Sequence, residues 1–355
     1  MIPRLRLLYR ADGGHRIGTG HVLRAVRVLR ELKRHVELEA ALAVSNDPSG
    51  LSYAAEAEVP LIVLPPSMYG GVKPVFEPDV LLKHVSLDEY DAIVVDMLDT
   101  PAGSLGVLSG PSRAVITMDD RGPGRYDADA IINFLVREPD PRSLPSHSQL
   151  YEGPEYVTLD PSYAEPCRRD RSKPSEGARV LVTLGGADAA GLSLKVARAL
   201  KRVAGIGAVE FICGKAYRHE PALRDTVRDA PWGYAIRHAM ASLRDAFLRS
   251  DLAVVAGGMT MHEACCTGTP AVAVCQPIDH QLELAEWFQK EGAMVSVGDG
   301  TVATEEDIAE AVAELLQDKA KRVRMSHVGP KLVDGQGTRR TAEAILKVAS
   351  AKTGR

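Results

Sequence analysis

Near its start the chain reads LRLLYRADGGHRIGTGH, residues 5–21, and a helical pattern, Val22–Leu32, follows it. The apolar run Leu5–Tyr9 predicts a buried strand, so the segment predicts a strand, a glycine-rich turn and a helix in succession. α/β proteins use this succession to present backbone N–H groups to a phosphate. The turn also carries two histidines, an aspartate and two arginines, which a simple chain reversal does not need. We therefore expect a nucleotide or sugar-phosphate site here.

The glycine spacing excludes two common nucleotide-binding classes. Gly13, Gly18 and Gly20 do not fit the dinucleotide fingerprint, and the turn lacks the Gly-Lys-Ser/Thr ending of a P-loop. The turn therefore predicts neither a dehydrogenase nor a kinase. With a formal net charge of −4, the chain also lacks the electrostatic signature of a nucleic-acid or anionic-membrane partner.

The cysteines and the hydropathy indicate a cellular location. The five cysteines lack the spacing of metal ligands or of a disulfide framework, which indicates a reducing compartment. The sequence contains neither an evident signal peptide nor an apolar run of about 18 residues. We expect a cytoplasmic protein with no integral membrane segment.

A length of 355 residues favours two domains. The charged, proline-bearing stretch Asp160–Lys173 predicts the boundary between them. We expect an N-terminal α/β domain over residues 1–160, which carries the catalytic histidine and the sugar side. A linker over 161–177 and a C-terminal α/β nucleotide-binding domain over 178–336 follow. A last helix over 337–355 is expected to pack back on the N-terminal domain.

Short aliphatic or β-branched runs alternate with helical patterns through both halves, which predicts a doubly wound parallel sheet in each. The predicted strands are Leu5–Tyr9, Leu61–Leu64, Ala92–Val95, Ala114–Thr117 and Ala130–Ile132, then Arg179–Thr183, Val209–Cys213, Leu252–Val255, Ala271–Val274 and Val295–Val297. Open parallel sheets bind ligands at the carboxyl ends of their strands, so the two sheets are expected to face a shared cleft.

The second half opens like the first. The run Val180–Leu184 leads into Gly185-Gly186-Ala187-Asp188, and a helix is predicted from about Leu192. The repetition of strand, double glycine and helix places a second expected ligand contact at Gly185 and Gly186.

A third glycine-rich segment reads AGGMTMHEACCTGTP, residues 256–270. A strand ends before Gly257 and Gly258, where the backbone can approach a ligand closely. Thr260 and Glu263 have the spacing of a helix capping box. The same geometry suits a diphosphate held at the helix start and a ribose held by Glu263. His280 and Gln281 follow the next strand and open another helix at the same sheet edge.

Together these motifs resemble the UDP-sugar hydrolases of the pseudaminic acid pathway and the related spore-coat polysaccharide biosynthesis proteins, which belong to the GT-B superfamily. The residues that carry the resemblance are Arg10-Ala11-Asp12-Gly13-Gly14, Ile17-Gly18-Thr19-Gly20-His21, Arg24, Tyr151–Tyr156, Leu184–Asp188, Ala256–Thr260, Glu263 and Gly268-Thr269-Pro270. The resemblance implies a GT-B-like α/β fold with the nucleotide held mainly by the C-terminal half. It also implies that His21 is the catalytic base, and that neither a metal nor a cofactor is used.

The chain departs from that family at two places. The family has Asp-His-Tyr where this chain has Asp96-Met97-Leu98, so the family's catalytic tyrosine is missing. The family has Asn-Gln where this chain has His280-Gln281. The first departure questions hydrolysis of the family's usual substrate, and the second changes an expected sugar or phosphate contact.

The expected catalytic residues are His21 and Asp12. A position at a helix start keeps the His21 imidazole neutral and able to accept a proton. Asp12 either fixes the turn through its side chain or orients a histidine. His15 is a weaker candidate, and paired Asp119 and Asp120 signal a metal only weakly, because adjacent side chains point in different directions.

The expected substrate-binding residues are Arg10, Gly13, Gly14, Gly18, Gly20, Arg24, Asn133, Gly185, Gly186, Gly257, Gly258, Thr260, Glu263, His280 and Gln281. Arg10 is expected to meet the charge of the leaving UDP, Arg24 to meet a phosphate, and Asn133 to reach the sugar from a strand end. The charged helix face formed by Arg24, Arg27, Arg30, Lys33 and Arg34 is more typical of a solvated face than of a phosphate track.

Three functions follow from this interpretation. The first is a hydrolase that releases UDP and a free modified sugar from a UDP-sugar, in surface polysaccharide or nonulosonic acid biosynthesis. The second is a glycosyltransferase with a UDP-sugar donor, in which His21 deprotonates an acceptor hydroxyl instead of water. The third is a nucleotide-sugar-binding protein that has lost catalysis. In each case the expected partner is a small-molecule nucleotide sugar.

Overall fold

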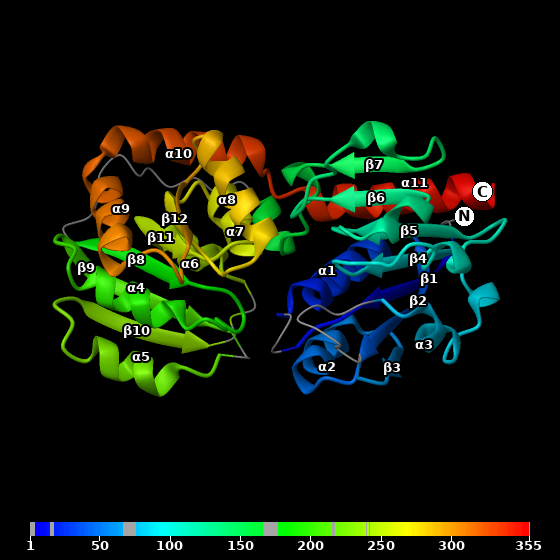
Figure 1. The fold of residues 1–355 in the computed structure, drawn as a ribbon, viewed down its shortest axis with the longest axis horizontal. Helices are drawn as coiled ribbons and strands as arrows, with labels where there is room; N and C mark the ends of the chain where they lie inside the picture. Colours follow the sequence, from blue (N-terminus) through cyan, green and yellow to red (C-terminus); the bar gives the residue numbers. More distant parts are fainter. Residues whose placement is uncertain are drawn as a thin grey trace. The chain divides into compact units, whose positions relative to one another are not determined.

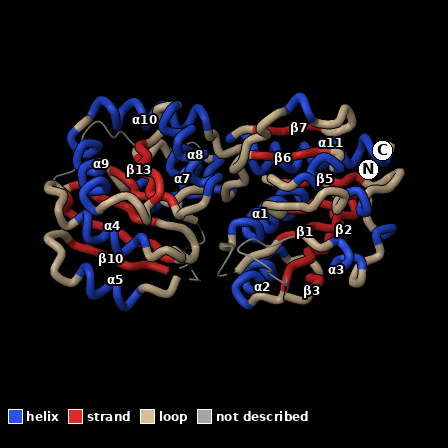
Figure 2. Tube along the Cα trace, viewed as in Figure 1, coloured by secondary structure: helices blue, strands red, loops and turns tan. Residues whose placement is uncertain are grey.

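The computed structural model of the chain describes residues 4–14, 18–66, 76–165, 177–214, 217–238, 240 and 242–354. The chain divides into two compact units, Met1–Leu159 with Gln336–Arg355, and Asp160–Gly335. In each unit a parallel sheet is flanked by helices (Figures 1 and 2). Most of the linker expected over 161–177 lies outside the described residues, which end at 165 and resume at 177.

The described residues of the first unit form a seven-stranded sheet in the order β3-β2-β1-β4-β5-β6-β7, in which every neighbouring pair is parallel. Its strands are β1 (Arg4–Ala11), β2 (Glu37–Ser45), β3 (Leu61–Leu64), β4 (Ala92–Asp96), β5 (Ala114–Met118), β6 (Ala130–Asn133) and β7 (Gln149–Glu152). Its α-helices are α1 (Gly20–His35), α2 (Pro48–Ala54), α3 (Pro78–Leu82) and α11 (Gly337–Thr353). Short 3-10 turns lie at Ala55–Ala57, Leu87–Glu89, Gly106–Leu108, Pro123–Asp127, Pro141–Ser143 and Pro154–Tyr156.

The described residues of the second unit form a six-stranded parallel sheet in the order β10-β9-β8-β11-β12-β13. Its strands are β8 (Ala178–Thr183), β9 (Ile206–Cys213), β10 (Gly233–His238), β11 (Leu252–Val255), β12 (Ala271–Cys275) and β13 (Val295–Asp299). Its helices are α4 (Leu192–Leu200), α5 (Glu220–Val227), α6 (Arg244–Arg249), α7 (Met259–Cys266), α8 (Asp279–Lys290), α9 (Glu305–Gln317) and α10 (Lys319–Leu332), with a 3-10 turn at Pro161–Ala164.

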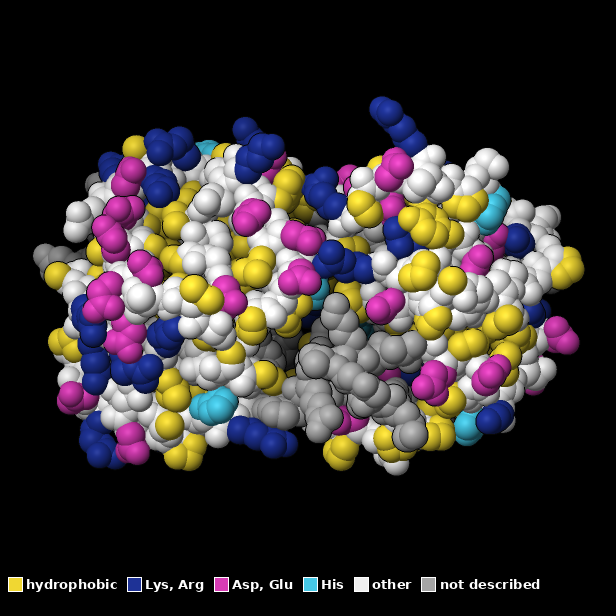
Figure 3. Space-filling view, in the orientation of Figure 1, with side chains coloured by type: hydrophobic (Ala, Val, Ile, Leu, Met, Phe, Trp, Pro, Cys, Tyr) yellow, Lys and Arg dark blue, Asp and Glu magenta, His cyan; other side chains and the backbone are white. Residues whose placement is uncertain are grey.

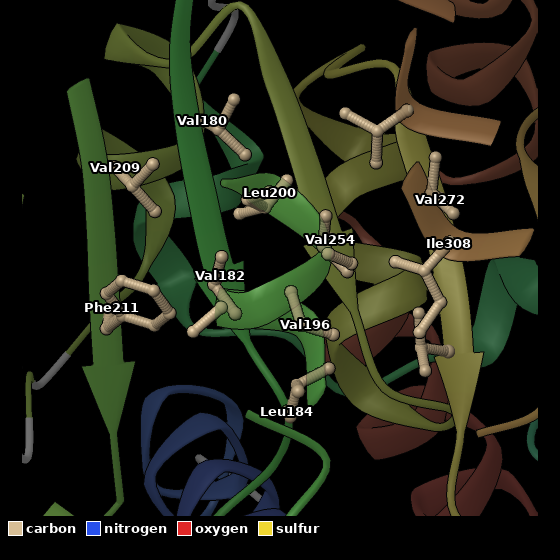
Figure 4. Packing of buried hydrophobic residues seen from close by; sticks show 14 of the residues in the cluster. Val180, Val182, Leu184, Val196, Leu200, Val209, Phe211, Val254, Val272 and Ile308 are labelled. Carbon is tan, nitrogen blue, oxygen red and sulfur yellow. The ribbon is translucent and has the colours of Figure 1, made fainter. Parts of the chain in front are cut away.

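Each sheet buries aliphatic side chains against its helices. In the second unit, Val182 and Phe211 of neighbouring strands pack with Val196 of α4, and Ile308 of α9 lies beside Val272 (Figure 4). In the first unit, Ile93 of β4 shares a buried cluster with side chains of β1, β2, β3 and β5. Burial on a central parallel strand explains why these segments are near-continuous apolar runs.

The prediction of a parallel-sheet α/β architecture is confirmed in both units. Three strands were missed. The edge strands β7 and β10 bury no residue completely, so neither presents an apolar run to the sequence. The first half of β2, which begins Glu37-Leu38-Glu39, is largely open to solvent. Strand pairing there depends on neighbours that a local pattern does not reveal.

Helix α11 belongs to the first unit although it follows the second in sequence. Thr338 Oγ1 donates to the carbonyl of Leu159 at 2.7 Å, and Thr341 Oγ1 donates to that of Tyr156 at 2.8 Å. Ile345 is completely buried. Figure 1 shows α11 running alongside the first sheet. Among the described residues, no helix has both the length and the apolar character of a membrane span.

We predict that Ile345→Ala lowers the free energy of unfolding by about 2–5 kcal/mol, because it leaves a cavity under α11. Ser350→Ala, on the exposed face of the same helix, is the control and is expected to change stability by less than about 0.5 kcal/mol. Urea unfolding of the two variants measures the difference. Equal stabilities would show that α11 is not needed for the core of the first unit.

Candidate functional site

His21 lies beside a buried carboxylate. It is the second residue of α1, and its Nδ1 is 2.6 Å from Oδ1 of Asp96, at the carboxyl end of β4. The His21 side chain is 21% exposed and that of Asp96 is 0% exposed. A carboxylate at this distance favours the tautomer in which Nδ1–H donates to Asp96. Nε2 is then the ring atom that can accept a proton.

Asp96 is a candidate site residue that the sequence did not predict. The family resemblance points only to the two residues after it, Met97 and Leu98. The available signal was its position directly after an apolar strand, because the carboxyl ends of parallel strands form the ligand-binding edge. Asp96 lies on the chain 75 residues from His21, so spacing alone could not pair them.

Arg24 is buried and paired with two carboxylates. Its Nε is 2.5 Å from Asp96 Oδ2, and its Nη1 forms an ion pair with Asp119 Oδ2. Its side chain is 2% exposed. Two consequences differ from expectation: Arg24 is already paired without a phosphate, and it is not part of a solvated basic face. Further along the same helix, Arg27 and Lys33 donate to backbone carbonyls of Thr158, Ala57 and Glu58.

These partners keep Asp96 ionised. Burial alone would raise the pKa of Asp96, but the charges of Arg24 and His21 and their hydrogen bonds hold it below its usual value. The hydroxyl of Tyr9 also donates to Asp96 Oδ2, at 3.0 Å. Burial, with the nearby Asp96 charge, raises the pKa of Tyr9 well above its usual value, so this hydroxyl stays protonated. Asp96 is therefore an anionic acceptor for the His21 ring.

The paired aspartates after β5 have separate structural roles. Asp119 Oδ1 accepts from the N–H groups of Phe134 and Leu135, both at 2.8 Å. Asp120 accepts from the N–H groups of Thr100 and Gly122, at 3.1 and 2.8 Å. Burial raises the pKa of Asp120 to about 6. The two side chains point to different partners, and the described residues contain no metal-like cluster of acidic, histidine and cysteine side chains.

Among the described residues, the Asp12 carboxylate links the carboxyl ends of β1 and β2. Its carboxylate forms a bidentate pair with Arg10, at 2.5 and 2.7 Å, and accepts from the N–H of Ser45 at 2.8 Å. Burial alone would raise the pKa of Asp12, but Arg10 and Ser45 lower it to about 2. Because Arg10 is 5% exposed and already neutralised by Asp12, the structure gives no support to its expected contact with the leaving UDP.

Two glycines of the first turn are explained by packing. A Cβ on Gly13 would lie 2.9 Å from Cγ2 of Val22, and one on Gly14 would lie 2.8 Å from Oδ2 of Asp47. Gly18 has a φ of +78°, which favours glycine whatever the space. Gly20 differs from the others, because its φ is not positive and a Cβ there would meet nothing within 4 Å. His15 lies outside the described residues.

Asn133 ends β6 and is 1% exposed. Its backbone carbonyl accepts from the N–H of Gly153 at 2.9 Å. Its side-chain amide atoms have no hydrogen-bond partner among the described residues. The residue occupies the strand end expected for it, but its side chain lies below the surface rather than on it.

In the second unit, the helix start after Gly185 and Gly186 is occupied by a side chain. Asp188 accepts from the N–H groups of Leu192 and Ser193, each at 2.9 Å, and from Nε2 of Gln276 at 3.0 Å. The carboxylate satisfies the donors that a phosphate would otherwise contact at the start of α4. Gly185 has a φ of +86°, which explains the glycine without a ligand.

The start of α7 has no side-chain cap. Its N-cap residue is Gly258, whose φ of +93° and ψ of −138° are open mainly to glycine. Thr260 is within the helix, and its Oγ1 donates back to the carbonyl of Ala256 at 3.0 Å. The proposed capping box is therefore wrong, because Thr260 is not the cap. Glu263 lies one turn later and is 5% exposed.

Gln281 packs directly on the glycine pair. A Cβ on Gly257 would collide with the Gln281 side chain, so glycine at this position lets the two elements approach. Gln281 Oε1 is buried and has no hydrogen-bond partner among the described residues. His280 lies beside it in the first turn of α8 and is half-buried. The structure thus brings Gly257, Gly258 and Gln281 together.

A cavity of about 220 Å³ lies between α8, β13 and α10, lined by Gln289, Gly292, Met294, Val295, Lys321, Arg324 and Met325. None of the expected site residues lines it. On the face drawn in Figure 3, positive and negative side chains are interspersed.

The two parallel α/β units define the GT-B fold, as expected. The solved structure of MurG from Acinetobacter baumannii matches with a TM-score of 0.69 and 17% identity, over 97% of this chain and 100% of that one. The calicheamicin glycosyltransferase CalG4 matches with a TM-score of 0.63 and 15% identity, over 99% of both chains.

By sequence, the chain is homologous to the spore coat polysaccharide biosynthesis protein SpsG of Bacillus subtilis. The two are 27% identical over 342 residues, which cover 95% of this chain and 96% of the relative. A UDP-N-acetylglucosamine–N-acetylmuramyl-(pentapeptide) pyrophosphoryl-undecaprenol N-acetylglucosamine transferase of Thiobacillus denitrificans is 29% identical over 186 residues, 51% of this chain and 50% of the relative. No protein family model matches the chain.

We predict that Gly13→Ala and Gly20→Ala separate packing from function. Gly13→Ala should cost about 1–3 kcal/mol of stability, because its methyl group overlaps Val22. Gly20→Ala should keep or raise stability by up to about 1 kcal/mol, because its Cβ enters open space. If substrate approaches this helix start, Gly20→Ala should nevertheless lower turnover. Urea unfolding and a turnover assay on both variants measure this, and full activity of Gly20→Ala would remove Gly20 from the site.

Proposed function

We propose that the chain is a nucleotide-sugar enzyme that acts at the anomeric carbon, and that its reaction is hydrolysis of a UDP-sugar. The observation that carries the proposal is the His21–Asp96 pair, in which Nδ1 lies 2.6 Å from a fully buried carboxylate. The GT-B fold and the homology to a polysaccharide biosynthesis protein support the choice of substrate class.

In the proposed reaction, Nε2 of His21 accepts a proton from water as the water oxygen bonds to the anomeric carbon. The bond from that carbon to the diphosphate oxygen breaks, and UDP leaves with its electron pair. Asp96 stabilises the imidazolium that forms and holds the ring in one tautomer. The start of α7 has no side-chain cap, so its first N–H groups, after Gly257 and Gly258, offer donors for the diphosphate. Glu263 is proposed to accept from the ribose hydroxyls.

Transfer of the sugar to an acceptor is a second candidate. Two observations favour it: the matched structures include glycosyltransferases, and Leu98 stands where the related hydrolases have a catalytic tyrosine. In this reaction His21 takes its proton from an acceptor hydroxyl instead of water.

The two candidates are separated by incubating the protein with a panel of UDP-sugars, including 2,4-diacetamido sugars, with and without acceptors. Release of UDP and free sugar without an acceptor supports hydrolysis, whereas release that requires an acceptor supports transfer. Calorimetry with UDP accompanies the assay. Tight UDP binding with no turnover across the panel would contradict both enzymatic proposals and favour a binding protein.

We predict that His21→Ala lowers kcat by about 10²–10⁴-fold, because the general base is lost. Asp96→Asn should lower kcat on the order of 10²-fold while leaving the ring in place, because the amide no longer fixes the tautomer. Turnover of the parent should also fall on the acid side, where a protonated ring cannot accept a proton. Stopped assays from pH 5 to 9 measure all three. Near-parental turnover by His21→Ala would assign the base to another residue.

We predict that Glu263→Ala raises KM and weakens UDP binding by roughly 10–100-fold, as expected for a lost hydrogen bond to a charged group. Its kcat should stay close to the parental value, because the ribose is bound equally in the ground and transition states. Glu286→Ala, on an exposed position of α8, is the control. Calorimetry gives the affinity and thermal melting the stability. Unchanged UDP affinity with lower stability would assign Glu263 a purely structural role.

A further inference from the structure

We propose that Asp119 is a positioning residue that keeps the buried charge beside His21 negative. The inference rests on the proposed function, in which His21 must become an imidazolium during the reaction. Asp119 acts through Arg24 and Asp96 and is given no contact with substrate.

The charged groups beside His21 form one buried unit. Asp96 comes from the end of β4, Arg24 from α1 and Asp119 from the segment after β5. Tyr9 of β1 also faces Asp96, and it is neutral because its pKa is raised by burial. Asp96 and Asp119 are completely buried, and Arg24 is 2% exposed. Two carboxylates and one guanidinium leave this unit with a net charge of −1.

A single carboxylate would not give the same field. Arg24 Nη2 bonds to Asp96 Oδ1 and also lies 2.9 Å from His21 Nδ1. With Asp96 alone, the ion pair would be neutral, and its positive end would point at the ring that must gain a proton. Asp119 compensates the guanidinium from its other side through Nη1. Opposite charge in a water-poor site stabilises a developing cation more than it would in water.

The backbone fixes Asp119 in this place. Its φ of +50° is uncommon for a residue other than glycine. Its Oδ1 accepts from the N–H groups of Phe134 and Leu135 at 2.8 Å, which leaves Oδ2 for Arg24. The Phe134 ring also packs on the guanidinium, with its centroid 4.9 Å from Cζ of Arg24. The carboxylate therefore cannot turn away from Arg24 without breaking the bonds that hold residues 134 and 135.

The test is Asp119→Asn, because an amide oxygen can still accept from the two backbone N–H groups but carries no charge. Asp91→Asn is the matched control. Asp91 is also a buried carboxylate; it immediately precedes β4, at the end away from Asp96, and pairs with Arg6. Histidine-labelled protein is titrated by ¹⁵N NMR, and the His21 signals are identified by their loss in His21→Gln. No substrate is needed for this measurement.

In Asp119→Asn we expect half-protonation of His21 at a pH lower than in the parent, by about one unit. Asp91→Asn should leave the pH of half-protonation unchanged. Asp119→Glu, which keeps the charge, should have the parental value. Arg24→Gln, which removes a positive charge, should move half-protonation of His21 to a higher pH. Unchanged titration in Asp119→Asn would overturn the proposal, as would failure of both Asp119→Asn and Arg24→Gln to fold while Asp91→Asn folds.

Turnover separates this inference from the proposed function. If UDP-sugars are consumed, Asp119→Asn should lower kcat about 10-fold, equivalent to the expected one-unit change, with little effect on KM. If the titration shifts but the protein consumes no UDP-sugar, the effect of Asp119 on His21 stands and the proposed function is rejected. Turnover that depends on His21, without any shift in Asp119→Asn, would reject the role of Asp119 alone.

Discussion

The ion pair between Arg24 and Asp96 ties α1 to the end of β4, and the candidate site of the first unit depends on it. A buried charge without a partner is strongly destabilising. Removal of either residue would therefore leave the other as an unpaired buried charge. The pair holds α1 against the carboxyl end of β4. His21 is one turn before Arg24 on the same helix. The ring therefore meets Asp96 because the helix is anchored through Arg24. Structure and proposed chemistry use the same contacts.

The sequence predicted the central strands because full burial produces apolar runs. β11 was predicted with the bounds that the structure has, and β4 differs by one residue. The edge strand β3 is only partly buried, but its apolar run also predicted its bounds. The family resemblance singled out His21, but the contacts of Asp96 with His21 and of Asp119 with Arg24 were not predicted, since these side chains meet only in the folded sheet. The carboxylate partners of Arg10 and Arg24 were not predicted, for a related reason. A sequence shows a basic residue near a turn, but not the carboxylate that already neutralises it.

Two glycine-rich helix starts in the second unit look alike in sequence and differ in structure. At α4, the Asp188 carboxylate occupies the backbone donors, and Gln276 holds that carboxylate in place. At α7, the residue that could have capped the helix, Thr260, turns its hydroxyl back to the preceding strand. Only the second start keeps its backbone donors clear of a side-chain cap. This difference is the physical reason for preferring α7 over α4 as the proposed diphosphate site.

The two residues that follow Asp96, where the related hydrolases have His-Tyr, bear on the proposed reaction. Met97, directly after Asp96, is 2% exposed and belongs to the buried cluster that contains Ile93. Leu98 follows it, and its carbonyl accepts from the N–H of Arg121 at 2.8 Å. Neither side chain can move a proton, which is consistent with the proposal that His21 is the base at this strand end. Displacement of a diphosphate needs one base for the attacking oxygen, because UDP leaves as an anion. In both proposed reactions the pair of His21 and Asp96 supplies that base, for water in the one and for an acceptor hydroxyl in the other.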